Sequence, residues 1–144
     1  MKYNAFISYS HAADGHMAPA LQTALERFAK PWYKLRNLNV FRDETNLSAT
    51  PHLWSNIQAS LEESEYLIYL ASPESAKSQW VQREIEYWLE NKSLDTLLIG
   101  LTSGKIMTDN SDDSDRNAIP KILSDALDGQ EPFYIDLRMT DSEE

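Results

Sequence analysis

Hydrophobic and polar positions along the chain alternate between short apolar runs and longer stretches with helical spacing. The apolar runs have the length of strands and are rich in β-branched and aromatic residues. The stretches between them repeat apolar residues every three or four positions, as on one face of a helix. Strand-length runs occupy residues 3–9, 38–41, 66–71, 96–101 and 133–137, and helical spacing occupies residues 14–30, 50–61, 73–91 and 119–127.

This alternation of strands and helices predicts parallel pairing through right-handed crossovers. We therefore expect an α/β fold, a flavodoxin-like doubly wound five-stranded parallel sheet with helices on both faces. Ligands of such sheets bind beyond the carboxyl ends of the strands, near the switch in strand order. The rule directs attention to the loops that follow Tyr9, Phe41 and Ala71.

The length of 144 residues suits one domain with a proper core, and we expect a single domain over residues 1–144. Because no closing helix follows the fifth predicted strand, we expect this domain to be the N-terminal part of a longer protein. The chain contains no cysteine, which excludes disulfides, thiolate catalysis and cysteine-ligated metals. No signal peptide is recognisable and no apolar run could span a membrane, so we expect a cytoplasmic protein without a membrane partner.

The charge distribution is uneven. The formal net charge is −10, and 11 of the 23 acidic residues lie in residues 105–144, so we expect no nucleic-acid partner. One basic cluster has no acid between its members. It is either a solvated edge or a docking patch for an acidic face of another copy or another domain. Its members are Lys30, Lys34, Arg36 and Arg42.

The third helical stretch carries the most interesting side chains. At about 100° per residue, Val81 and Ile85 share the face expected to pack against the core. A second face, about 100° away, carries Glu84 between Trp80 and Tyr87. The pattern alone favours a surface glutamate beside aromatic residues at the margin of the core. Its position, on a helix that starts at the ligand-binding edge, favours a functional carboxylate.

Other candidate sites are weaker. The three histidines lack the spacing of metal ligands, and the acidic residues 109–115 lack the glycine and the final glutamate of a calcium loop. The four glycines do not cluster into a phosphate-binding loop. Ser8 and Ser10 lack a histidine and aspartate pair for nucleophilic catalysis. We therefore expect no metal.

Several of these segments, taken together, resemble Toll/interleukin-1 receptor (TIR) domains. Residues 3–10, YNAFISYS, are similar to the first conserved box of that family. Residues 40–43, VFRD, followed by Leu47, resemble the second strand and the start of the BB loop. Residues 70–73, LASP, and then residues 78–85, SQWVQREI, resemble the segment with the tryptophan and glutamate of TIR domains that cleave NAD. These motifs cover residues 3–88 in the order and spacing of the family, and residues 30–33, KPWY, before VFRD look most like bacterial TIR domains at the front of multidomain, defence-related proteins.

The resemblance implies that Glu84 is the catalytic glutamate of an NAD+ glycohydrolase or cyclase, with NAD+ as substrate and no cofactor. Cleavage of the nicotinamide–ribose bond creates an oxocarbenium-like sugar, which a carboxylate stabilises. Nicotinamide leaves from a cationic pyridinium, so no general acid is needed. By the same resemblance Trp80 packs against the base or ribose, and Leu53 or its neighbour Trp54 matches an aromatic position of the family. The remaining expected substrate contacts are Tyr9, Ser10, His11 and Asp43.

The resemblance also implies self-association with other TIR domains and coupling to C-terminal sensor domains. A non-enzymatic adaptor that acts through homotypic TIR contacts is the main alternative, and a nucleoside-processing enzyme of related fold is a weaker one. The expected self-association residues are Lys34, Arg36, Arg42, Leu47 and Thr50.

Overall fold

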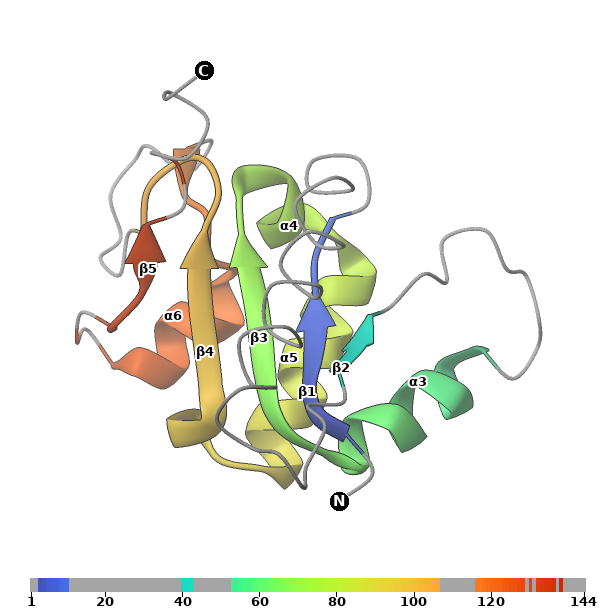
Figure 1. Cartoon of the computed structure of the whole chain (residues 1–144). Helices are drawn as coiled ribbons and strands as arrows, with labels where there is room; N and C mark the ends of the chain where they lie inside the picture. The colour runs from blue at the N-terminus through green and yellow to red at the C-terminus, as the bar shows by residue number, and fades with distance from the viewer. Residues whose placement is uncertain are drawn as a thin grey trace, which may run out of the picture.

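A parallel β-sheet forms the centre of the computed structural model, which describes residues 3–10, 40–42, 53–106, 116–128, 130, 132–136 and 138. The five strands lie in the order β2-β1-β3-β4-β5, which is the flavodoxin-like order. All their carboxyl ends point the same way, upward in Figure 1. The predicted α/β fold with a parallel sheet is thus confirmed. The strands are β1 (Tyr3–Ser8), β2 (Val40–Arg42), β3 (Ser64–Ala71), β4 (Leu97–Leu101) and β5 (Ile135–Asp136).

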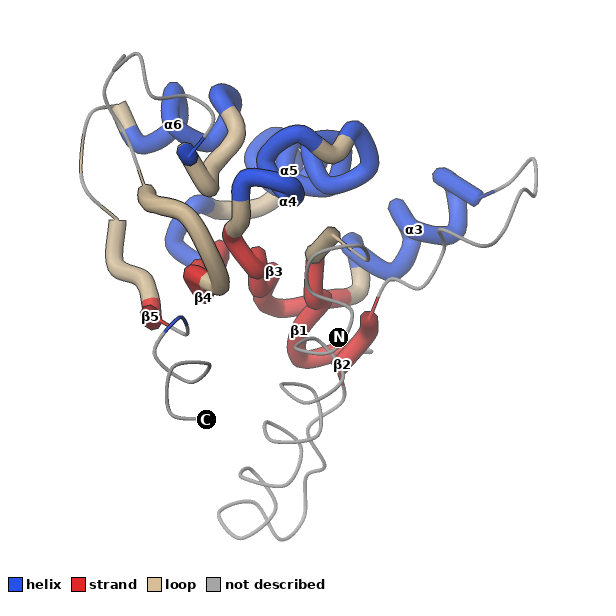
Figure 2. The backbone as a smooth tube through the Cα atoms, turned by 90° about the horizontal axis from the view of Figure 1, so that it is seen from above, coloured by secondary structure: helices blue, strands red, loops and turns tan. Residues whose placement is uncertain are grey.

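The described helices gather on one side of this sheet. Figure 2 shows α3, α5 and α6 side by side there, with α5 in the middle. The helix predicted over residues 14–30 lies outside the described residues. No helix in the described part of the chain has the length and apolar character needed to cross a bilayer. The helices are α3 (Leu53–Glu62), α4 (Pro73–Lys77), α5 (Gln79–Asn91), the 3₁₀ turn η2 (Leu94–Thr96) and α6 (Lys121–Leu127).

One predicted helix, residues 73–91, is divided into α4 and α5. Ser78 has an extended backbone between them, and its side chain accepts a hydrogen bond from the backbone N–H of Val81. Ser72 starts α4 in the same way, by accepting from the N–H of Ser75. Each serine satisfies an N–H that the first turn of a helix leaves unpaired, so each begins a new helix.

The core lies between the sheet and α5. Phe6 of β1 and Tyr69 of β3 pack beneath the stripe of α5 that contains Val81, Ile85 and Trp88, and all of them are buried. The prediction that this stripe faces the core is correct. The indole N–H of Trp88 donates to the backbone carbonyl of Ser93 and to the hydroxyl of Thr96. The ring is therefore buried without an unsatisfied donor. α5 is thereby fixed over the sheet.

Candidate functional site

A buried hydrogen bond joins the end of β1 to the second turn of α5. The Ser8 hydroxyl donates to Oε1 of Glu84 over 2.6 Å. Ser8 is 0% exposed and Glu84 is 1% exposed. This distance lies at the short end of the usual range for hydrogen bonds between two oxygen atoms. The Glu84 carboxyl group, bonded to the Ser8 hydroxyl, therefore lies at the carboxyl end of β1, the edge of the sheet where such folds bind ligands.

The local sequence explains this contact. Side chains two residues apart share one face of a strand, so Ser8 points to the same side as Phe6, toward α5. Glu84 lies one helical turn before Trp88 and faces the sheet with it. The small Ser8 side chain at the end of β1 leaves room under the helix for a carboxylate. The expectation that Glu84 lies on a boundary face was wrong, since Glu84 is as buried as the core stripe.

A serine network holds the chain on both sides of this carboxylate. The backbone N–H of Ser10 donates to the hydroxyl oxygen of Ser75 over 3.0 Å. The Ser72 hydroxyl donates to the same oxygen, also over 3.0 Å. These bonds tie the segment after β1 to the start of α4. Of the expected substrate contacts, Tyr9 is buried and Ser10 is half-buried at this edge.

Trp80 belongs to an aromatic and cationic cluster between α5 and α3. Its ring centroid lies 6.2 Å from that of Trp54, with the rings tilted by 37°. The Arg83 guanidinium lies 4.1 Å from the Trp54 centroid and 5.3 Å from the Trp80 centroid, within range of cation–π attraction. Trp80 keeps 36% of its surface exposed. Arg83 was not among the predicted site residues, although its position three residues after Trp80 places the two on neighbouring parts of the helix surface.

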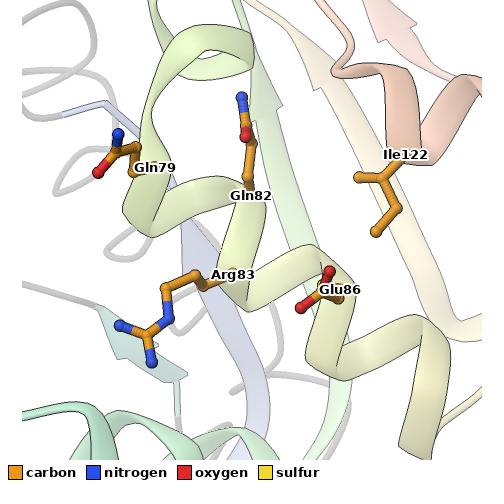
Figure 3. A pocket seen from close by; sticks show the side chains of 5 residues that line it. All are labelled: Gln79, Gln82, Arg83, Glu86 and Ile122. Carbon is orange, nitrogen blue, oxygen red and sulfur yellow. The ribbon is translucent and has the colours of Figure 1, made fainter.

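A shallow hollow of about 350 Å³ lies beside α5 and is lined by Gln79, Gln82, Arg83, Glu86 and Ile122. Figure 3 shows Arg83 extending away from Ile122, which belongs to α6 on the other side of the hollow. Among the residues that the structure describes, none of the expected substrate contacts lines this hollow, and neither does Glu84. We therefore do not assign it to the site that contains the Ser8–Glu84 bond.

Tyr87 does not flank Glu84 in the way its place on the helix suggested. Its hydroxyl donates to Oε2 of Glu62 on α3 over 2.5 Å. The pKa of Tyr87 is raised to about 12, mainly by burial of the phenol and secondly by its hydrogen bond to Glu62. Tyr87 is thus part of the contact between α3 and α5.

The remaining predicted site residues are partly described. Arg42 is the last residue of β2, opposite Ile7 in the register with β1, and Leu53 is the first residue of α3. These positions put the backbone of Arg42 beside the last residues of β1. The other predicted residues lie outside the described residues: His11 and Asp43 among the substrate contacts, and Lys34, Arg36, Leu47 and Thr50 among the self-association residues.

Comparison with known proteins agrees with this arrangement. The family model of the TIR domain matches residues 5–144, so the chain belongs to the TIR domain family and the predicted resemblance is confirmed. The chain is also 48% identical over 147 residues to the NAD(+) hydrolase ApTIR of Actinoplanes sp.. That match includes 99% of this chain but 20% of the relative, so the chain spans about a fifth of that protein's length.

Among solved structures, the chain is similar to the TIR domains in the activated Roq1 resistosome that directly recognises the pathogen effector XopQ. The TM-score is 0.49 and the sequence identity is 17%. The match covers 69% of this chain and 57% of that one.

Proposed function

We propose that this TIR domain cleaves the nicotinamide–ribose bond of NAD+ and that Glu84 is the catalytic carboxylate. The observation that carries the proposal is a carboxylate, 1% exposed, held by Ser8 at the ligand-binding edge of the sheet. Burying a carboxylate costs free energy, so buried carboxylates concentrate at sites that use them. The 48% identity to a protein named as an NAD(+) hydrolase supports the same reaction.

In the proposed reaction the bond between the ribose anomeric carbon and the nicotinamide nitrogen breaks, and its electron pair neutralises the pyridinium. The sugar becomes oxocarbenium-like, and the negative charge of Glu84 stabilises it. Water then adds to the anomeric carbon and loses a proton, which gives ADP-ribose, or a nucleophilic atom of the adenine closes a cyclic ADP-ribose. Trp80 packs against the base or ribose, and Tyr9 and Ser10 line the site.

The other proposed substrate contacts are His11, Asp43 and Leu53, with Glu84 as the one catalytic group.

Assembly is part of the proposal. At 1% exposure, Glu84 reaches a substrate only after its surroundings open. Homotypic contacts between TIR domains would supply that opening, so we propose that activity depends on self-association. The proposed contacts are Lys34, Arg36, Arg42, Leu47 and Thr50. In this proposal the domain acts in bacterial immune signalling in the cytoplasm, under the control of C-terminal sensor domains.

The test is chromatographic measurement of NAD+ and nicotinamide with wild-type protein beside Glu84→Ala. Both proteins are assayed in a self-associated state, obtained by fusion to an oligomeric scaffold. We expect NAD+ loss with equal release of nicotinamide in the wild type and none in the variant. Equal NAD+ loss in both would remove Glu84 from the mechanism. An assembled wild type that leaves NAD+ intact would favour the adaptor, and turnover of nucleosides alone would favour the nucleoside-processing enzyme.

A further inference from the structure

The Ser8 hydroxyl is placed by backbone geometry to an unusual degree. β1 is paired on both sides, with β2 and with β3, and Ser8 lies opposite Tyr69 in the register with β3. A serine side chain has one heavy-atom torsion, so a fixed backbone nearly fixes its oxygen. Ser8 is also completely buried, which keeps water from replacing its hydrogen bond. The donor to Glu84 is therefore rigid before any substrate binds.

The acceptor is different. A glutamate side chain has three torsions and loses more conformational freedom than most side chains when it is held in one rotamer. It extends from α5, an element separate from β1, and 76 residues separate it from Ser8 in the chain. The 2.6 Å bond to Oε1 fixes the far end of this side chain relative to the sheet. Packing alone would not select the rotation of the carboxylate plane, whereas a directed hydrogen bond does.

From this geometry we infer that Ser8 is a positioning residue for Glu84. The inference rests on the proposed function, in which the Glu84 carboxylate must lie beside the developing charge on the ribose. Ser8 holds the carboxyl group of Glu84 in one orientation, because a hydrogen bond from a fixed hydroxyl is directional. It takes no part in proton transfer or nucleophilic attack. Preorganised groups of this kind act on the transition state more than on substrate binding.

The structure supplies a matched control for the loss of a buried serine hydroxyl. Ser64 is also 0% exposed, and its hydroxyl donates to the carbonyl of Ser60 over 2.7 Å. Ser64 is the first residue of β3, at the amino end of the sheet, opposite the Ser8 edge. Removal of either hydroxyl takes one hydrogen bond of a buried serine from the fold. Of these two changes, only removal of the Ser8 hydroxyl takes away a hydrogen bond to Glu84.

The test compares Ser8→Ala, Ser8→Thr and Ser64→Ala with the wild type in the same self-associated state, after thermal melting has shown that each variant is folded. We expect Ser8→Ala to lower kcat for NAD+ cleavage by about tenfold to a hundredfold, with KM within about twofold. Ser8→Thr keeps the hydroxyl on a strand-compatible side chain and should recover most of the loss. Ser64→Ala should keep kcat within about twofold of the wild type. Equal kcat in Ser8→Ala and Ser64→Ala would overturn the inference.

A second readout does not depend on activity. The ¹³C resonance of the Glu84 carboxyl carbon, assigned by its absence from Glu84→Gln, reports the hydrogen bond directly. It should move in Ser8→Ala, return toward the wild-type position in Ser8→Thr and stay unchanged in Ser64→Ala. An unmoved resonance in Ser8→Ala would show that Ser8 merely fills space. If the assembled wild type leaves NAD+ intact, the proposed function fails, and this resonance alone still decides whether Ser8 orients Glu84.

Discussion

Two hydroxyl–carboxylate hydrogen bonds lie on the same helix and serve different purposes. Near the start of α5, Ser8 donates to Glu84 over 2.6 Å. Further along α5, Tyr87 donates to Glu62 over 2.5 Å. The chemical groups and distances are nearly the same, but Glu84 is buried whereas Glu62 is exposed. The environment of the carboxylate therefore distinguishes the two bonds.

The Tyr87–Glu62 bond has the character of a structural contact. Lys92 donates from Nζ to the backbone carbonyls of Glu62 and Ser64, both over 2.8 Å, at the same end of α5. Together these bonds join α3, α5 and the start of β3. Glu62 is exposed and keeps its hydration, so its charge adds little unfavourable free energy. The bond can therefore support the packing of α3 against α5.

The Ser8–Glu84 bond differs, because its carboxyl group is not hydrated. Glu84 is buried, and its desolvation is unfavourable in free energy. It lies at the edge of the sheet where ligands bind. An unfavourable burial of this kind, without an evident gain in stability, is typical of sites selected for activity. We therefore propose that the burial of the carboxyl group at the binding edge, rather than the hydrogen bond itself, marks Glu84 as the functional residue of the two.

The largest expected effect separates the two carboxylates directly. Glu84→Gln keeps the side-chain shape but removes the charge, so we expect a loss of NAD+ cleavage of about a thousandfold. Glu62→Gln makes the same change in the exposed partner of Tyr87 and should leave cleavage within about twofold of the wild type. Nicotinamide release from the assembled proteins measures both. Comparable losses in the two variants would mean that burial does not distinguish their roles.

The next effect concerns the two neighbours Trp80 and Val81. Trp80→Ala removes the exposed ring proposed to pack against the base or ribose and should lower kcat/KM by up to about tenfold. Val81→Cys changes a core side chain with little change of volume and should stay within about twofold. Steady-state kinetics on NAD+ tests the order of the two. The reverse order would mean that the Trp80 ring does not contact the substrate.

The fold was largely predictable because periodicity records which side of an element is apolar. The stripe through Val81 and Ile85 is buried as predicted. The break at Ser78 was missed because a serine is tolerated inside a helix as well as at its start. The last strand, predicted over residues 133–137, is the shorter Ile135–Asp136, since the apolar Phe133 is exposed and unpaired with the sheet.

The sequence offered Glu84 as a candidate, which stays a prediction, but the geometry around it was not predictable. The resemblance to TIR domains pointed to Glu84, while helical periodicity placed it on a boundary face. Periodicity gives an angle around the helix and contains nothing about the strand beneath it. The hydroxyl of Ser8, which was set aside for lack of a catalytic pair, comes from a residue 76 positions away. Only the parallel register of β1 and the packing of α5 bring the two together.

A smaller effect is expected on stability when the structural bond is removed. Tyr87→Phe deletes the hydroxyl that donates to Glu62 and keeps the ring in place. We expect a loss of about 0.5–1.5 kcal/mol in the free energy of unfolding, measured by urea denaturation. NAD+ cleavage should remain within about twofold of the wild type. A large loss of cleavage in a fully folded Tyr87→Phe protein would place Tyr87 in the site beside Glu84.

The smallest effect appears only at alkaline pH. The pKa of Tyr87 is raised from its ordinary value of 10.0 to about 12 in the folded protein, so the folded state holds this proton more tightly than the unfolded state. The stability that this provides is complete below pH 10 and is lost as the pH rises from 10 to 12. The difference in unfolding free energy between wild type and Tyr87→Phe should therefore be constant from pH 7 to 9 and shrink above pH 10. Urea denaturation of both proteins at matched pH measures this difference. Other groups that titrate at alkaline pH are present in both proteins, so their effects cancel. A difference that stays constant up to pH 11 would show that Tyr87 ionises as readily in the folded as in the unfolded chain, and the bond to Glu62 would then be no tighter than an ordinary surface contact.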